Sequence, residues 1–220
     1  MSSRYSVNRA AAQFEPRGDW DGPIWSQAET LDICHYMGRE PEHKPKTQAK
    51  MLYDEQSIHV IFRVEDKYVR AVARNHLDAV WEDSCVEFFF TPGGNVSKGY
   101  FNVETNCGGT MLFRWNNSAG VHTHLSDDER AGVHIYHSEP KIIEPEKQAP
   151  LVWVVEYNFR IDILAKYCSI VRPTPGVLWR GNFYKCGDKT SRPHWLTWSV
   201  VDWPKPNFHL PQFFGILEFM

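Results

Sequence analysis

The sequence predicts an all-β fold, an antiparallel β-sandwich of the jelly-roll or immunoglobulin-like type with few short helices. Aromatic residues, which favour strands, make up 14% of the chain. Several runs alternate apolar and polar side chains, and clusters rich in Gly, Pro, Asn and Asp separate them. Helical patterns are confined to residues 25–31 and 161–167. We therefore expect one domain over residues 1–220, with residues 1–18 as an N-terminal extension.

The first predicted strands are a hairpin and a separate strand after it. Residues 48–53 and 59–64 are rich in strand-forming side chains, and the polar residues 54–56 between them suit a turn. Residues 84–90 (Ser-Cys-Val-Glu-Phe-Phe-Phe) are expected to form the next strand. This strand is expected to end at residues 91–94 (Thr-Pro-Gly-Gly), because Pro and Gly interrupt strands.

A second hairpin is predicted where residues 99–106 and 110–115 flank residues 107–109 (Cys-Gly-Gly). Glycine adopts the positive φ of a tight turn without strain, so this short segment suits the connection. Residues 137–149 are rich in Glu, Lys and Pro and are expected to form a surface loop. The remaining strands are expected at residues 151–161, 177–186 and 212–220.

Four of these strands combine an apolar row with a polar row, because successive side chains of a strand point to opposite faces. In residues 84–90, the side chain of Glu87 lies on the face opposite the apolar row. In residues 99–106, Asn102 and Glu104 lie opposite the apolar row in the same way. The corresponding polar residues of the other two strands are Glu156, Asn158, Arg160, Arg180 and Asn182. A solvated sheet face would explain such rows, but asparagine is disfavoured in strands. Carboxylate, amide and guanidinium groups together suit the hydroxyl groups of a carbohydrate.

A carbohydrate site also needs an aromatic platform, because the sugar ring presents apolar C–H faces. Trp81 comes just before residues 84–90 and next to acidic residues, so we expect it at a strand entrance near Glu87. Trp198 and Trp203 are further candidates near the C-terminus. Trp203 precedes a proline and is expected in an exposed loop.

Charge and cysteine content limit the partners and the compartment. The net charge of −3 gives no excess of basic residues that would favour binding to nucleic acid. The sequence contains no run of about 18 apolar residues, so no membrane span is predicted. The first residues lack an apolar signal segment, and the five cysteines suggest no disulfide framework. We therefore expect a cytoplasmic protein unless its start has been trimmed. Cys85 and Cys107 are expected to be small core residues.

Several segments, in order along the chain, resemble the family 9 carbohydrate-binding modules and their DOMON-like relatives. The most specific segment, residues 81–87, resembles a W-x-D-x-x-V-E motif. Residues 100–106 with Gly109 resemble a Y-F-x-x-E-x-N-x-x-G motif. The other similar segments are residues 21–28, 49–66 and 207–215.

The resemblance implies a β-sandwich that binds carbohydrate without cleaving it and supports polysaccharide breakdown. In such modules two tryptophans enclose a terminal sugar, and a carboxylate and amides bind its hydroxyl groups. Trp81 and Glu87 fall on the matching motif positions. The second tryptophan is not fixed by a motif, and Trp198 and Trp203 are the candidates. These modules often hold structural Ca²⁺, for which the possible carboxylate ligands here are Asp66 and Asp83.

Three other functions are compatible with parts of the sequence. Some DOMON-like relatives transfer electrons through haem held by Met and His, and Met111, His122 or His134 would be available. A glycosidase would use a carboxylate pair such as Glu87 and Glu104, although no catalytic motif accompanies it. A protein-interaction sandwich would have the same polar face without a cleft.

Overall fold

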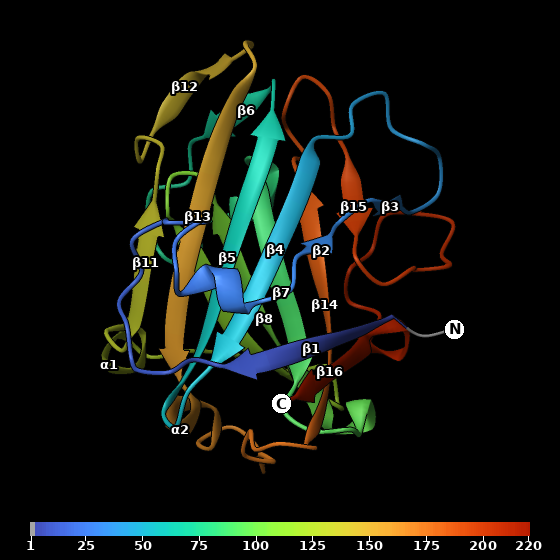
Figure 1. Cartoon of the computed structure of the whole chain (residues 1–220). Helices are drawn as coiled ribbons and strands as arrows, with labels where there is room; N and C mark the ends of the chain where they lie inside the picture. The colour runs from blue at the N-terminus through green and yellow to red at the C-terminus, as the bar shows by residue number, and fades with distance from the viewer. Residues whose placement is uncertain (1–2) are drawn as a thin grey trace.

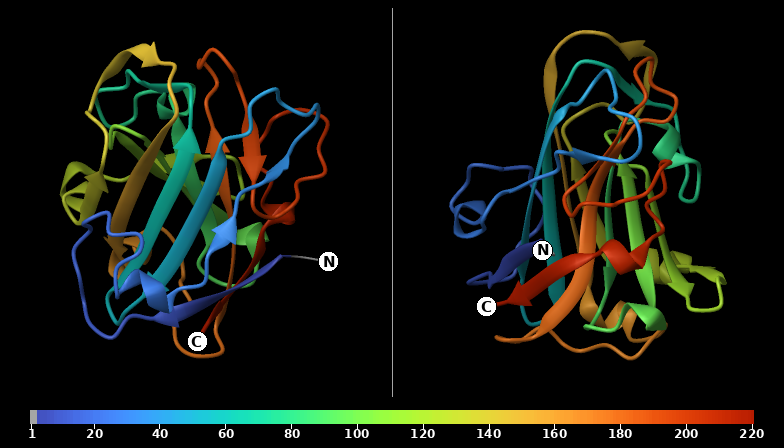
Figure 2. Two further views of the ribbon diagram at one scale, coloured as in Figure 1. Left: turned by 45° about the horizontal axis from the view of Figure 1, so that its top comes forward. Right: turned by 90° about the vertical axis from the view of Figure 1, so that its right-hand side faces the viewer.

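The computed structural model describes residues 3–220 and consists of two β-sheets packed face to face (Figure 1). The right-hand view of Figure 2 shows the two layers nearly edge-on. This arrangement confirms the predicted all-β sandwich. The front sheet contains, in spatial order, β1 (Arg4–Arg9), β4 (Lys46–Tyr53), β5 (Ser57–Asp66), β13 (Leu151–Arg160) and β11 (Val133–His137). The back sheet contains β10 (His122–His124), β9 (Met111–Asn117), β8 (Gly99–Asn106), β7 (Cys85–Thr91), β14 (Leu178–Cys186) and β16 (Gly215–Phe219).

Strand β1 connects the two sheets. Its first part pairs in parallel with β16 of the back sheet, and its end pairs in parallel with β4 of the front sheet. Tyr5 and Val7 of β1 are buried in the core. The expectation that residues 1–18 form an extension is therefore wrong for β1, because its alternating side chains belong to the sandwich.

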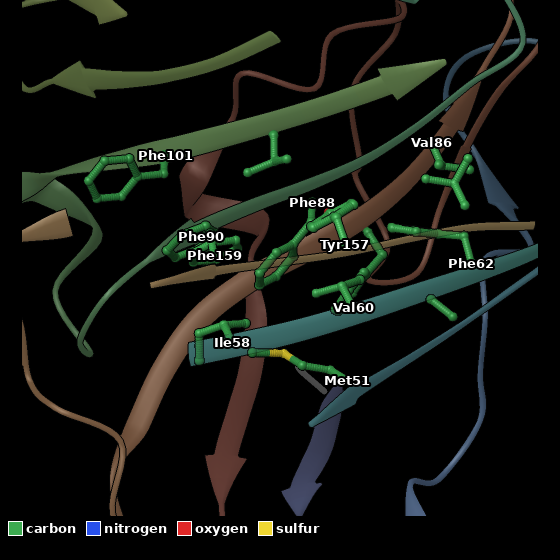
Figure 3. Packing of buried hydrophobic residues seen from close by; sticks show 14 of the residues in the cluster. Met51, Ile58, Val60, Phe62, Val86, Phe88, Phe90, Phe101, Tyr157 and Phe159 are labelled. Carbon is green, nitrogen blue, oxygen red and sulfur yellow. The ribbon is translucent and has the colours of Figure 1, made fainter. Parts of the chain in front are cut away.

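The hydrophobic core lies between the sheets, where the predicted alternation places it. Phe88 and Phe90 of β7 point inward and stack on each other, with ring centroids 4.7 Å apart. Phe159 of β13 stacks on Phe90 from the opposite sheet at 5.5 Å. Figure 3 shows these rings with Val60 and Tyr157 of the front sheet between the two layers. The predicted inward faces of β7 and β13 are therefore confirmed.

Both predicted hairpins are present. Strands β4 and β5 pair antiparallel on either side of residues 54–56, and β8 and β9 pair on either side of residues 107–109. Gly109 has φ of +79°, and a Cβ atom there would lie 2.3 Å from the ring of His137. Glycine is therefore required at this turn by both conformation and space.

Other predictions about local structure need correction. Residues 137–149 are not one loop, because β12 (Ile143–Lys147) pairs with β6 (Val69–Ala71) there. The two predicted helices are single turns, η1 (Trp25–Gln27) and α2 (Ile161–Leu164). The remaining short elements are β2 (Leu31–Asp32), β3 (His35–Tyr36), η2 (Val80–Glu82), η3 (Val96–Lys98), α1 (Asp127–Arg130), β15 (Trp195–Thr197) and η4 (Pro211–Phe213). Over residues 3–220, every helix is too short to span a membrane.

The outer faces of the two sheets are covered by different parts of the chain. On the front sheet, Glu156 of β13 accepts hydrogen bonds from the backbone of Arg17 and Gly18 and from Trp25 Nε1. On the back sheet, residues 198–214 between β15 and β16 form what we call the C-terminal segment, and its Phe208 stacks on Tyr184 of β14 at 4.1 Å. The four predicted polar rows therefore do not form one face, because β13 belongs to the sheet opposite β7, β8 and β14.

Candidate functional site

A pocket of about 330 Å³ lies on the outer face of the back sheet, and we call it the tryptophan pocket. Wider hollows of about 570 Å³ lie beside α1 and at the end of β1, and neither is lined by Trp, Tyr or Phe. A hollow of about 490 Å³ on the front sheet is lined by Trp25 and Glu156, but that carboxyl group already accepts three hydrogen bonds from the protein. The tryptophan pocket is lined by Trp81, Glu87, Glu104, Arg114, Cys186, Asp188, Trp195, Pro206, Asn207, Phe208 and His209.

The strand register of the back sheet builds the floor of the pocket. Glu87 of β7 pairs directly with Glu104 of β8, and β9 lies on the other side of β8 and carries Arg114. These side chains alternate with the buried aromatic rows, so they point away from the core. Both carboxyl groups are nevertheless buried, because the C-terminal segment covers this part of the sheet.

Trp81 and Trp195 provide the aromatic part of the lining. Trp81 lies in η2, directly before β7, and is 36% exposed. Trp195 begins β15, which pairs with the end of β14. The Trp195 indole donates a hydrogen bond of 2.7 Å to Asp188 Oδ1, and the Asp188 backbone N–H donates one to the Trp81 carbonyl. Asp188 therefore connects the two tryptophan segments.

A hydrogen-bond network beside the floor, on the same face of β8 and β9, fixes its polar groups. Asn102 is fully buried, and its Nδ2 donates a bond of 2.6 Å to Glu104 Oε1. Its Oδ1 accepts bonds from Arg114 Nε and Asn116 Nδ2. Asn102 therefore does not line the pocket; it holds Glu104 and Arg114 in position.

Burial changes the protonation of the pocket carboxyl groups. Desolvation, Cys186 and Glu104 raise the pKa of Glu87 well above its usual value. Desolvation raises the pKa of Glu104 to about 7, although Arg114 and Asn102 oppose this change. The pKa of Asp188 is also raised by burial. Carboxyl groups that keep a proton near neutral pH donate as well as accept hydrogen bonds, which suits hydroxyl-bearing ligands.

The C-terminal segment closes one side of the pocket. His209 Nδ1 lies 2.7 Å from the Tyr100 hydroxyl, and its Nε2 lies 3.4 Å from Arg114 Nη2. Burial and the charge of Arg114 lower the pKa of His209 to about 4, so the ring is neutral near pH 7. An Arg donor requires His209 Nε2 to accept, which assigns the proton to Nδ1. Asn207 Oδ1 accepts the His209 backbone N–H and fixes this turn.

The structure brings together three of the predicted site residues, Trp81, Glu87 and Glu104, and places Asn102 beside Glu104 on the same face of β8. Asn182 lies elsewhere, fully buried, where it exchanges hydrogen bonds with the backbone of Ser199. That pairing holds the C-terminal segment against β14, so the amide of Asn182 is not available to a ligand in this pocket.

Trp198 and Trp203 lie outside the tryptophan pocket. Trp198 is buried in the core, where its ring meets Phe183 edge-on at 5.9 Å. Gly215 leaves room for it, because a Cβ there would lie 2.5 Å from the Trp198 ring. Trp203 is 43% exposed in the loop after β15. The second pocket tryptophan is instead Trp195, whose side chain points away from that of its buried neighbour Leu196.

The other polar lining residues that were not predicted as site residues are Arg114, Asp188, Asn207 and His209. Asn207 and His209 lie in the segment 207–215 that resembles the family, although no ligand contact was predicted for them. Arg114 follows the period-two pattern of its strand, in which Phe113 points to the core. The loop residues have no periodic signal, because their positions depend on where the C-terminal segment crosses the sheet.

Asp66, a predicted Ca²⁺ ligand, is already paired with cationic and N–H groups. Its Oδ1 lies 2.7 Å from His43 Nε2 and accepts the backbone N–H groups of Lys67 and Tyr68. The ammonium of Lys185 lies 3.5 Å from its Oδ2. This donor set occupies the space that a calcium ion would need, so the residues around Asp66 do not fit calcium.

Asp83, the other predicted ligand, is also saturated. Its Oδ2 accepts hydrogen bonds from the backbone of Val72 and Ala73 and from Asn106 Nδ2. Its Oδ1 accepts one from Arg70 Nε. Asp83 therefore fixes the turn before β7, and its oxygens do not fit calcium.

The haem alternative has no support in the described part of the chain. Met111 is buried at the start of β9. His122 Nδ1 lies 2.6 Å from Asn116 Oδ1 on the back sheet, whereas His134 of β11 on the front sheet pairs with Glu15. The two histidines therefore lie on different sheets and are engaged with other side chains.

Comparison with known proteins identifies the family. The family model described as carbohydrate-binding family 9 matches residues 27–219. A candidate carbohydrate-binding protein from Bacteroides uniformis is 28% identical over all of both chains, with a TM-score of 0.88. A family 9 carbohydrate-binding module from Caldicellulosiruptor kristjanssonii, solved with cellotriose, is 12% identical, with a TM-score of 0.66 over 99% of this chain and 93% of that one. The same organism's module solved with glucose gives the same identity and score, over 99% and 96%. Among curated proteins, none matches this chain.

Proposed function

The chain belongs to carbohydrate-binding family 9, and we propose that the tryptophan pocket is where it holds its sugar. Its function is carbohydrate binding without catalysis. We assign the site to this pocket because Trp81 and Trp195 line it together with buried carboxyl groups and Arg114. Ligand pockets combine apolar walls with a few polar groups in this way.

The chemistry of the pocket accounts for sugar binding. The indole rings of Trp81 and Trp195 would contact the apolar faces of a sugar ring. Glu87, Glu104 and Arg114 would exchange hydrogen bonds with its hydroxyl groups, and charged or bidentate groups make the stronger bonds. The network through Asn102 holds two of these groups in place before the ligand arrives, which reduces the entropy lost on binding.

The volume of the pocket indicates a small ligand. About 330 Å³ is near the lower end of the range for ligand pockets, roughly 300–1,000 Å³. We therefore propose that the pocket takes one or two sugar units, such as the end of a longer chain. Glucose and cellotriose are the first ligands to test, because the two similar family 9 modules were solved with them.

Isothermal titration calorimetry with glucose, cellobiose and cellotriose tests this proposal. We expect binding by the unchanged chain and at least a tenfold loss of affinity, about 1.4 kcal/mol, for Trp81→Ala and for Trp195→Ala. Trp203→Ala is the matched control, since it removes an exposed tryptophan outside the pocket and should leave affinity unchanged. Equal affinity in all three variants would place the sugar elsewhere on the molecule.

A further inference from the structure

Two cysteines and a glutamate form a compact group at the floor of the tryptophan pocket. Cys85 of β7 and Cys186 of β14 are paired directly across the strands, and Glu87 lies two residues further along β7 on the same face. One ligand atom from each of the three residues lies within 4.8 Å of the others. Cys186 Sγ lies 3.1 Å from Glu87 Oε1. Within residues 3–220 this is the sole group of His, Cys, Asp and Glu with such spacing.

We propose that Cys85, Cys186 and Glu87 bind a thiophilic divalent metal ion of the zinc class. Two thiolates and a carboxylate are ligands that zinc accepts, whereas calcium and magnesium prefer oxygen ligands alone. Zinc–sulfur and zinc–oxygen bonds of about 2.3 and 2.1 Å place tetrahedral ligand atoms roughly 3.5–3.8 Å apart. The three side chains are therefore near this spacing before any ion arrives.

The surroundings of the group favour a cation. Glu104 and Asp188 line the same pocket, and Arg114 is the one basic side chain among the lining residues other than neutral His209. In the metal-free protein, the Cys186 thiol donates a hydrogen bond to Glu87. Binding of the ion would replace that hydrogen bond and release the protons of the two thiols and of the carboxyl group to solvent.

An ion can reach this group from solvent. Cys186 and Glu87 line the pocket, whereas Cys85 is fully buried beneath it. Three protein ligands leave the fourth tetrahedral position free, and that position would face the pocket. Cys107 differs from these cysteines, because it is buried in the core cluster between the sheets and donates to the Arg70 carbonyl.

The first experiment uses the reduced, metal-free chain titrated with Co²⁺ and Cd²⁺. We expect one equivalent to bind, with the absorption of a thiolate-to-metal bond. Cys85→Ala and Cys186→Ala should each abolish that absorption, and Glu87→Gln, which keeps the shape of the side chain, should weaken affinity. Cys107→Ala and Cys34→Ala are the controls and should leave it unchanged. Circular dichroism establishes that each variant is folded.

Two results would overturn the metal site. One is a folded, reduced chain that shows no thiolate absorption with either ion. The other is the same absorption in the folded Cys85→Ala and Cys186→Ala variants as in the unchanged chain. If the cysteine variants do not fold, Glu87→Gln decides, because unchanged affinity there would remove the carboxylate from the site.

A consequence for sugar binding rests on the proposed function, because Glu87 would serve both ligands. Zinc at about nine times its Kd should raise the apparent Kd for glucose about tenfold, as mass action requires of ligands that exclude each other. The Cys186→Ala variant should show no such effect. Unchanged glucose affinity in the zinc-bound chain would refute the shared use of Glu87. Absence of glucose binding in the metal-free chain would instead count against the proposed function alone.

Discussion

Lys185 and Cys186 are neighbours in β14 and take part in two buried polar clusters of opposite character. Lys185 points between the sheets, with its ammonium 5.6 Å from the ring centre of Trp153. Cys186 points outward to the floor of the tryptophan pocket. The inner cluster consists of Lys185, Asp66, His43 and His194, and the outer one of Glu87, Glu104, Asp188 and Arg114.

The inner cluster is closed and its charges are balanced. Lys185 Nζ donates to His194 Nε2 at 2.8 Å and lies 3.5 Å from Asp66 Oδ2. Lys185 and a hydrogen bond with His43 lower the pKa of Asp66 even though burial opposes this. Desolvation and Lys185 lower the pKa of His194 to about 3, so it stays neutral and accepts a hydrogen bond. Every charged group here has a partner in the protein.

The outer cluster is open and has more carboxyl groups than cations. Glu87 and Glu104 have raised pKa values because burial is not compensated by enough positive charge. Two clusters with similar numbers of buried polar residues can therefore have different roles. A cluster that satisfies itself stabilises the sandwich, and one that does not is available for a ligand.

The largest expected effect comes from breaking the inner cluster. Lys185→Met leaves Asp66 buried without its ammonium partner, so the free energy of unfolding should fall by about 3–5 kcal/mol. Urea unfolding measures this change. Lys189→Met is the control, because Lys189 forms an exposed pair with Glu82 and should cost less than about 1 kcal/mol. Equal small effects would mean that the inner pair contributes little.

Replacing a carboxyl group of the outer cluster by a neutral amide should raise the free energy of unfolding, whereas breaking the inner cluster should lower it. Glu104 has a raised pKa, so its contribution to stability is greatest below its usual value of 4.5 and is lost as the pH rises to about 7. Glu104→Gln should therefore raise the free energy of unfolding at pH 8 by about 2–3 kcal/mol and change it little at pH 4. The exposed Glu55→Gln should change neither value. A loss of stability at pH 8 would show that the Glu104 carboxylate is well compensated.

The inner cluster should produce acid sensitivity between pH 6.5 and about 3. His194 has a lowered pKa, so the folded state binds fewer protons than the unfolded state in this range, and stability falls as the pH falls. Asp66 acts in the same direction, because its lowered pKa adds stability that is lost as the pH falls through the acid range. His194→Gln should flatten the pH dependence of urea unfolding above pH 4. If the free energy of unfolding of His194→Gln depends on pH as that of the unchanged chain does, the acid sensitivity arises from other groups.

The smallest expected change in stability concerns the platform itself. Trp81→Ala should lower the free energy of unfolding by less than about 1 kcal/mol, because Trp81 is 36% exposed. Trp198→Ala removes a core ring and should cost about 3–5 kcal/mol. Thermal unfolding compares the two. A large loss of unfolding free energy in Trp81→Ala would show that Trp81 is a structural residue. A loss of sugar affinity in that variant would then no longer indicate that Trp81 contacts the sugar.

The sequence by itself determined which face the long predicted strands bury. Period-two alternation assigned Phe88 and Phe90 to the core and Glu87 to the other face, and the motif at residues 81–87 joined Trp81 to Glu87. These relations hold between residues that are close in sequence, where strand geometry alone decides the direction of a side chain.

Only the tertiary structure decided which residues meet. Trp195 and His209 enter the pocket because β15 pairs with the end of β14 and the C-terminal segment crosses the back sheet. The same fold places Trp198 in the core and sets the polar row of Glu156 on the opposite sheet. The strand order of β7, β8 and β14 and the path of the covering loops fix these contacts. Such long-range packing leaves no local pattern from which a single sequence reveals it.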